Sequence, residues 1–516
     1  MQTQHKCPPV AFAFLVVVAL SQFLVAQPNR EASHVAPSSQ ACEARSNDTA
    51  DKLLECIQAS SLWSRLSVFQ SISDAHPGQD GHGNRDAGTS GYKASVNFVA
   101  KLMRQAGYTV TLQTYQFLAS DVVGTPQFDI AGQGYPAEQW YVARLSAGGT
   151  LKSPIQPAAR SGTGCSPSEF AGFLPGNIAL LERGSCSYDT QVNHAAQAGA
   201  AGVILYNSPV MPAVSGADYG AAFQARLART SSIPVVGVVS YTIGSDLQRR
   251  YLDGAAPVAH FDIRTQARAV TDYNLIADSP LGDTTHVVVV DAHLDSIFGA
   301  GMLDNASGST TILEIALKMA NTSTLNQLRY IWFGGEELGL NGSRYYTTHL
   351  SPSQRKQIAF DIDADVTATP NFDYEIADPA FAGNRNQFPP NVIPQSKTGN
   401  QFYTDFFTSQ GVPSQPAPFG NDGTDSNSFA LIGVPNTGIL TRQDCCKDQS
   451  EVNIWGGFPG NYEGNIPSFD GGCVDYPGRW CDNLDNNDPN VLELASQATA
   501  YVVLKMANFQ FPHGSR

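Results

Sequence analysis

The sequence predicts an α/β protein with a mostly parallel central sheet that is flanked by helices. One observation is the β-branched run Val287–Val290, and a second is the apolar run Tyr330–Phe333; both are typical of buried strands. The third is that strand and helix patterns alternate after Tyr273. The chain has 516 residues, which is too long for a single core, so we expect more than one domain.

The amino terminus has the pattern of a secretory signal peptide over residues 1–26, and residues 27–50 have the pattern of a linker. Lys6 precedes an apolar stretch from Val10 to Leu20, and small residues at Ser21 and Ala26 suit cleavage. An uncleaved membrane anchor is the alternative, but the apolar stretch is short for a bilayer span. We therefore expect export, and no membrane association once the signal is removed.

The chain between residues 51 and 272 divides into two parts of different composition. Within residues 51–127, apolar residues at helical spacing predict a helix over Ser95–Ala106, and a strand follows over residues 109–117. Over residues 128–272, Gly-, Ala- and Pro-rich turns separate short apolar strands. Two of these strands cover residues 178–181 and 203–206, and a helix over residues 188–198 lies between them. Nothing in this second part indicates a catalytic role.

The pattern of a helix-flanked sheet continues from residue 273 to residue 512. One predicted strand ends at Asp291, and others cover residues 328–333, 357–366 and 436–440. The predicted helices cover residues 309–319, a segment that begins near Glu337, and residues 491–506.

Charge and cysteine content limit the possible classes of function. The formal net charge of −15 and the low share of charged residues, 15%, argue against a nucleic-acid partner. Beyond Cys7 in the signal, eight cysteines form an even set, which favours disulfides and an exported protein. Proximity in the sequence suggests the pairs Cys42–Cys56 and Cys165–Cys186. The last four have three possible pairings: Cys445, Cys446, Cys473 and Cys481.

Glycosylation patterns are consistent with export. Asn47, Asn321 and Asn341 each begin an Asn-x-Ser/Thr motif and are candidate acceptors. Asn305 also begins such a motif, but it lies too near the candidate metal ligands described next to be a credible acceptor.

An imidazole and several carboxylates follow the two apolar runs that predict buried strands. His293 comes after Val287–Val290, and Glu336 and Glu337 come after Tyr330–Phe333. Open α/β sheets place ligands at the carboxyl ends of their strands, so we expect these side chains to meet at one edge, with Asp304 nearby. This combination of side chains predicts a metallohydrolase.

Several motifs resemble those of the secreted co-catalytic zinc aminopeptidases related to aminopeptidase Y and bacterial leucyl aminopeptidase. They are the loop at residues 84–89, the segments at residues 293–296 and 304–308, and Gly335–Ser343. Residues 177–184 and 195–204 resemble a protease-associated domain. The resemblance implies a peptidase domain in two parts, residues 51–127 and 273–512, interrupted by a β-rich protease-associated insert over residues 128–272.

The resemblance also implies roles for individual side chains. His293 and Asp365 would bind one zinc ion, Asp304 would bridge two zinc ions, and Glu337 would bind the second. Glu336 would be the general base that takes a proton from water and returns it to the leaving amine. Asp295 would accept a hydrogen bond from the second nitrogen of the His293 ring.

The chain departs from the family pattern at the last ligand, where relatives have a histidine near a tyrosine between two cysteines. Counting from Cys473 places Asp475 at the ligand position, whereas counting from Cys481 places Gly478 there. An aspartate is a plausible zinc ligand, and its added charge would favour a harder ion such as manganese. A glycine would leave the second site one ligand short.

Two functions follow from this reading. The first is a secreted aminopeptidase, extracellular or vacuolar, that uses two zinc ions to remove the first residue of peptides with free amino termini. The second is a catalytically impaired pseudopeptidase that acts as a binding protein. Carboxypeptidase, endopeptidase and glutaminyl-cyclase-like reactions remain alternatives within the same broad fold.

Overall fold

The structure is a computed structural model, and it describes residues 37–511 apart from several internal segments. Those segments are residues 79–80, 136–139, 144, 160–161, 184–185, 208–224, 226, 228–229, 239, 298, 383, 418–422, 444–446, 460–461 and 463–481. The predicted signal peptide, Asp475, Gly478 and the last four cysteines lie outside the described residues. No helix among the described residues is long and apolar enough to cross a bilayer.

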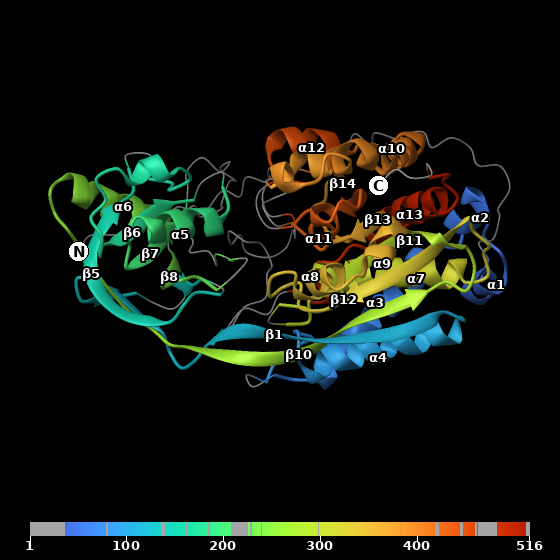
Figure 1. Ribbon diagram of the computed structural model, residues 1–516, viewed down its shortest axis with the longest axis horizontal. Coiled ribbons are helices and arrows are strands. Elements are labelled where there is room, and N and C mark those ends of the chain that lie inside the picture. Colours follow the sequence, from blue (N-terminus) through green and yellow to red (C-terminus); the bar gives the residue numbers. More distant parts are fainter. Residues whose placement is uncertain are drawn as a thin grey trace, which may run out of the picture. The chain divides into compact units, whose positions relative to one another are not determined.

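Among the described residues, a mixed sheet of eight strands forms the centre of the larger part of the chain (Figure 1). Its order is β1-β10-β12-β11-β13-β16-β14-β15, and the strands β12, β11, β13 and β16 run parallel to one another. The strands are β1 (Thr109–Val122), β10 (Thr265–Asp278), β11 (Asp283–His293), β12 (Asn326–Phe333), β13 (Ile358–Ala364), β14 (Glu375–Ala377), β15 (Gln415–Ala417) and β16 (Asn436–Leu440). The predicted α/β class with a central parallel sheet is confirmed.

Helices cover both faces of this sheet. The larger hydrophobic core includes Val288 and Val290 of β11, and the helices around it are α2 (Ala50–Leu54), α3 (Ala59–Ala75), α4 (Ser90–Gln105), α7 (Gly308–Met319), α10 (Val392–Gln410) and α13 (Pro489–Ala507). The alternate residues Val287 and Val289 belong to a smaller core with α8 (Asn341–Thr348) and α11 (Ser426–Leu431). Because side chains alternate along a strand, β11 is buried on both faces, as its β-branched run predicts.

The predicted helix that opens near Glu337 begins later than expected, at Asn341. Gly335 has a φ of +62° and Leu340 has a φ of +56°, both in the left-handed region, so the chain turns between β12 and α8 instead of entering the helix directly. Glu336 and Glu337 therefore lie in a turn. Two short helices, α9 (Pro352–Gln357) and α12 (Gln449–Trp455), complete this part.

A second sheet of eight strands lies within residues 127–263, in the order β3-β2-β9-β5-β6-β7-β8-β4. Its strands are β2 (Gln127–Ile130), β3 (Gln133–Gly134), β4 (Trp140–Val142), β5 (Gly149–Pro157), β6 (Ile178–Glu182), β7 (Gly202–Tyr206), β8 (Val235–Val238) and β9 (Val258–Ile263). Helices α5 (Tyr188–Gln197) and α6 (Tyr241–Leu252) accompany them. The predicted strands at residues 178–181 and 203–206 are β6 and β7. β1 and β10, which pair along all of their length, join this part to the central sheet.

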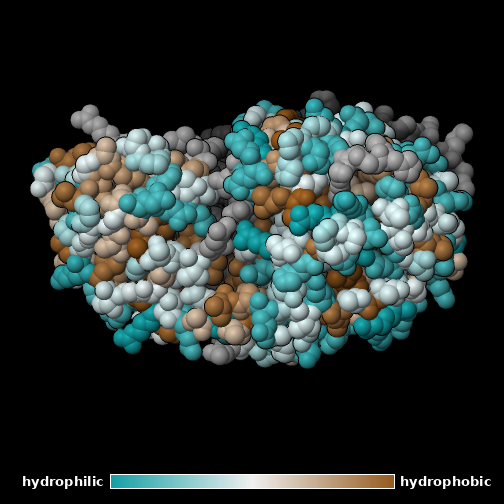
Figure 2. Space-filling view, in the orientation of Figure 1, coloured by the Kyte–Doolittle hydropathy of each residue, from teal (hydrophilic) through white to brown (hydrophobic). Residues whose placement is uncertain are grey.

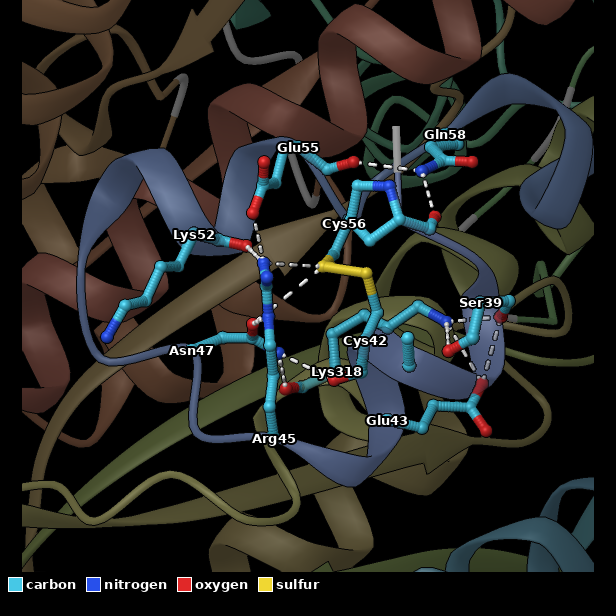
Figure 3. The surroundings of a disulfide bond; sticks show 12 residues. Ser39, Cys42, Glu43, Arg45, Asn47, Lys52, Glu55, Cys56, Gln58 and Lys318 are labelled. Carbon is cyan, nitrogen blue, oxygen red and sulfur yellow. Dashed lines mark hydrogen bonds and ion pairs between the residues drawn. A yellow bond between two sulfur atoms is a disulfide. The ribbon is translucent and has the colours of Figure 1, made fainter. Parts of the chain in front are cut away.

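The two disulfides suggested by proximity are present. Cys165 bonds to Cys186, and Cys42 bonds to Cys56. Figure 3 shows that the Cys42–Cys56 bond lies beside the buried Lys318. The ammonium group of Lys318 contacts Ser39 and Glu43 at the start of the described chain. The disulfide joins α1 (Ser39–Ala44) to the residues that follow α2, and Lys318 attaches α1 to α7.

The three glycosylation motifs differ in exposure. Asn47 is fully buried, and its side-chain amide donates to the carbonyl oxygens of Cys42 and Lys318, at 2.9 and 2.6 Å. The expectation of a glycan on Asn47 is therefore wrong for this fold, since no sugar fits there. Asn321 is exposed and remains a candidate acceptor, and Asn341 is partly buried.

The molecular surface is a mixture of hydrophilic and hydrophobic areas. On the face shown in Figure 2, the hydrophobic areas alternate with hydrophilic ones. Among the described residues, the most exposed large hydrophobic side chains are Leu118, Leu174 and Leu252, which come from separate parts of the chain.

Candidate metal centre

The ends of three neighbouring parallel strands bring the predicted ligands together. His293 is the last residue of β11, Asp365 follows β13, and Glu336 and Glu337 follow β12. His293 is four residues after Val289, and Asp365 is four residues after Asp361, which pairs with Val289. Because side chains alternate along a strand, His293 and Asp365 lie on the same face of the sheet as Val289.

The His293 ring is surrounded by carboxylates. Its Nε2 atom lies 2.9 Å from Asp304 Oδ1, 3.4 Å from Asp365 Oδ1 and 3.9 Å from Glu336 Oε2. Two triads each place one ligand atom per residue within 4.8 Å of one another: His293, Asp304 and Asp365, and His293, Glu336 and Glu337. The structure thus brings together all predicted site residues that it describes.

Asp304 reaches the site from a turn that precedes α7. Its backbone is not helical, with φ −112° and ψ 98°. Beside it, the buried Asn305 side chain accepts hydrogen bonds from Gly308 N and Val366 N and donates one to Ala364 O. Asn305 therefore ties the start of α7 to the end of β13. A Cβ at Gly308 would lie 2.0 Å from Ala364 O, so only glycine allows this approach.

Asp295 lies beside the His293 ring and also contacts the Glu336 turn. Its carboxylate lies 3.6 Å from His293 Nδ1, whereas its backbone carbonyl oxygen lies closer, at 3.1 Å. The carboxylate also accepts hydrogen bonds from the backbone N–H groups of Glu336 and Glu337, at 3.2 and 3.3 Å. Asp295 therefore links the β11 end to the Glu336 turn, and the carbonyl is the closer partner for fixing the ring of His293.

The buried Arg85 holds the loop that leads from His293 to Asp304. Its guanidinium donates to the carbonyl oxygens of Leu294, Ala300 and Gly301, at 2.8, 2.7 and 2.7 Å. Phe69 packs against it, with the ring centroid 5.2 Å from Cζ. Burial lowers the pKa of Arg85 to about 10, and nearby carboxylates, first that of Asp482, oppose this shift. The guanidinium remains charged at neutral pH. Sequence reasoning predicted a loop here but not this contact, which joins residues more than 200 positions apart.

Electrostatics favour a cation among these side chains. Burial acts to lower the pKa of His293, but the carboxylates of Glu336 and Asp365 outweigh it, and the pKa is raised well above its ordinary value. Asp365 Oδ1 is buried without a hydrogen-bond partner in the described part of the chain. A group of carboxylates this close requires positive charge to remain ionised.

Further buried carboxylates lie beneath the site and were not predicted. Asp361 and Asp363 continue the alternation that ends at Asp365, and Asp291 is two residues before His293. Burial raises the pKa of Asp363 to about 7, and burial also raises the pKa of Asp291 and of Asp361 well above its usual range. The period-two spacing of Asp361, Asp363 and Asp365 was the available signal in the sequence.

The donor set fits a divalent transition metal. Imidazole nitrogen and carboxylate oxygen are the usual ligands of catalytic zinc, which keeps a coordination position open to water. His293 is 1% exposed and Glu336 is 5% exposed, whereas Asp304 and Asp365 keep 15% and 14%, so the site opens on the side of these two aspartates.

Comparisons with known proteins agree with this geometry. Residues 274–503 match the model of peptidase family M28, and residues 151–247 match the PA domain model. Residues 274–503 are thus similar to peptidase family M28. The M28 match includes every predicted site residue that the structure describes, and the PA match falls in the second sheet, which precedes the M28 match in the chain.

Curated relatives match most of this chain. An aminopeptidase of Pseudomonas aeruginosa is 29% identical over 470 residues, covering 87% of this chain and 81% of the relative. A probable leucine aminopeptidase 2 of Aspergillus fumigatus is 27% identical, covering 87% and 84%. These matches confirm the predicted resemblance of the chain to aminopeptidases.

Solved structures share the fold of most of this chain. An aminopeptidase from an Aneurinibacillus strain has a TM-score of 0.64 at 19% identity, covering 89% of this chain and 96% of that chain. A zinc aminopeptidase from Bacillus subtilis has a TM-score of 0.56 at 22% identity, covering 87% and 94%.

Proposed function

We propose that the protein is a secreted, zinc-dependent aminopeptidase that removes the first residue from peptides with free amino termini. The observation that carries this proposal is the convergence of His293, Asp304, Asp365, Glu336 and Glu337 at the ends of parallel strands. The names of the relatives, aminopeptidase and leucine aminopeptidase, support the reaction class, and none of the comparisons favours the pseudopeptidase alternative.

The proposed ligand set has two parts. His293, Asp304 and Asp365 would hold one zinc ion, and Glu337 with the bridging Asp304 would hold a second. Asp475 would complete the second site. Bound zinc supplies Lewis acidity, which polarises a carbonyl group and lowers the pKa of water. A similar structure titled a zinc aminopeptidase supports the choice of metal.

Glu336 would act as the general base. Its carboxylate lies beside the ligand cluster, where it would remove a proton from the attacking water and then deliver that proton to the leaving amine. The backbone N–H of Glu336 donates to Asp295, which fixes the turn that presents the carboxylate. The surrounding negative charge also suits a substrate whose free α-amine is protonated.

Replacing Glu336 by glutamine tests the proposal. A general base typically contributes 10²- to 10⁴-fold, so turnover of a leucyl-anilide substrate should fall by roughly that factor. Zinc content should stay close to wild type, because Glu336 is not a proposed ligand. Glu493→Gln is a suitable control, since Glu493 accepts a hydrogen bond from Ala59 N that glutamine can also accept.

Two results would contradict the proposal. Wild-type turnover in the Glu336→Gln variant would show that Glu336 is not the general base. A wild-type chain that holds no zinc and hydrolyses no peptide, even after purification with zinc, would favour the binding protein instead.

A further inference from the structure

Three consecutive backbone N–H groups around Asp304 donate to one residue, Asp482. Leu303 N lies 2.7 Å from Asp482 Oδ1, and Asp304 N lies 3.0 Å from Oδ2. Met302 N donates to the backbone carbonyl oxygen of Asp482 at 3.3 Å. Both oxygens of one carboxylate are therefore engaged by the peptide groups that carry Asp304 into the site.

Asp482 is itself firmly held. Its side chain is buried, with 3% exposure, and the Arg85 guanidinium supplies positive charge nearby. Two residues later, Leu484 N donates to Gln70 Oε1 at 2.9 Å, which attaches the same segment to α3. Asp482 is thus an anchor between the chain that leads into α13 and the turn that presents Asp304.

The consequence for Asp304 follows from hydrogen-bond chemistry. Bonds from N–H groups to a carboxylate are short and roughly twice as strong as neutral ones, so they restrict the backbone at Leu303 and Asp304. The side chain of Asp304 must point at His293, where its Oδ1 lies 2.9 Å from Nε2. A turn with freedom to rotate at Asp304 would lose that direction.

We propose that Asp482 is a positioning residue, which sets the affinity of the centre for zinc by fixing the backbone of Asp304. This inference rests on the proposed function, because Asp304 must be a metal ligand for it to hold. Residues that orient metal ligands typically change metal affinity by 10- to 100-fold when they are replaced.

Asp482→Asn is the informative variant, because it keeps the size of the side chain and one acceptor oxygen. Its NH₂ group cannot accept the second backbone N–H, so either Leu303 N or Asp304 N loses its partner. Asp482→Glu keeps both acceptor oxygens and serves as the conservative variant.

Asp488→Asn is the matched control. Asp488 also accepts two backbone N–H groups, from Asn490 at 2.7 Å and Val491 at 3.2 Å, but these belong to the start of α13 and not to the metal centre. Both bonds go to Oδ1, and asparagine caps a helix as well as aspartate does, so this variant removes a carboxylate charge without altering the affinity for zinc.

The experiment uses the full chain. Each variant is stripped of metal with a chelator, its thermal unfolding is measured without metal, and it is titrated with zinc by calorimetry. Turnover and KM for a leucyl-anilide are then measured at saturating zinc. We expect Asp482→Asn to bind zinc about 10- to 100-fold more weakly, with KM nearly unchanged and activity recovering as zinc is raised. Asp488→Asn should bind like wild type, and Asp482→Glu should lie nearer to wild type than Asp482→Asn.

Several outcomes would overturn the inference. One is a wild-type affinity for zinc in Asp482→Asn. Another is an affinity in Asp488→Asn or in Asp482→Glu that is as weak as in Asp482→Asn. In each case the carboxylate at residue 482 would have no specific role. If Asp482→Asn does not fold, Asp482→Glu is compared with Asp488→Asn. Weaker zinc binding by Asp488→Asn than by Asp482→Glu would then overturn the inference. A wild-type chain without zinc would instead show that the proposed function has failed.

Discussion

Replacing Arg85 by methionine should loosen the loop that joins His293 to Asp304 and destabilise the fold. The side chain is fully buried, and methionine fills much of its length while removing all three hydrogen bonds to the loop carbonyls. A hydrogen bond that involves a charged group contributes roughly 1.5–3 kcal/mol. Three such bonds at the lower end of that range amount to about 4.5 kcal/mol of unfolding free energy.

Such a loss is a large fraction of the stability of an ordinary domain, roughly 5–15 kcal/mol. The Arg85→Met variant should therefore fold at low temperature and unfold at clearly lower urea concentration than wild type. Its turnover should fall by about 100-fold, the typical effect of a misplacement of about 1 Å at a reacting centre. Arg85→Lys retains the charge but cannot reach three carbonyl groups in different directions, so it should be intermediate in both measurements.

Urea unfolding followed by fluorescence, together with leucyl-anilide hydrolysis, would test this prediction. A loss of less than about 1 kcal/mol in Arg85→Met, with turnover close to wild type, would refute the reasoning, because the loop would then keep its shape without the guanidinium. If Arg85→Lys has the unfolding free energy and the turnover of wild type, a point charge alone is enough to hold the loop.

Two further predictions concern other buried charges. Burial raises the pKa of Glu375 from 4.5 to about 8, even though Arg442 Nε lies 3.2 Å away. The folded state therefore binds this proton more tightly than the unfolded chain, so stability should fall as the pH rises from 5 to 8, by roughly 4 kcal/mol if Glu375 acts alone. Glu375→Gln should flatten the pH dependence of the melting temperature; an unchanged slope would contradict the assignment. Lys318→Met should cost roughly 3 kcal/mol in urea unfolding, since it removes the cation from a buried ion pair with Glu314, 3.1 Å away. Adding Glu314→Gln to Lys318→Met should recover part of this loss. If the double variant loses as much unfolding free energy as the two single variants together, the two side chains do not form a stabilising ion pair.

Much of the central sheet could be predicted because its strands carry strong local patterns. The predicted strand at residues 436–440 has the bounds of β16, and the predicted helix at residues 491–506 lies within α13. α10 was not predicted, because Pro394 and Gly399 interrupt its helical pattern. Glycine is required at residue 399 by tertiary packing, because a Cβ there would lie 2.7 Å from the Phe360 ring.

The metal centre was predicted as far as its ligands follow strands. His293, Glu336, Glu337 and Asp365 each come at or just after a strand whose pattern is visible in the sequence. The residues that hold them, Arg85, Asn305 and Asp482, contact backbone groups far away in the sequence. A linear pattern does not encode such contacts, so these residues required the folded structure.

The attachment of α1 to α7 limits where the mature chain can start. Lys318 is fully buried and depends on Ser39 and Glu43 for two of its contacts. Removal of the chain as far as Ser38 leaves these contacts intact, whereas removal beyond Glu43 takes both of them away from a buried ammonium group. Shortened versions of the enzyme made for crystallisation should therefore begin no later than Ser38.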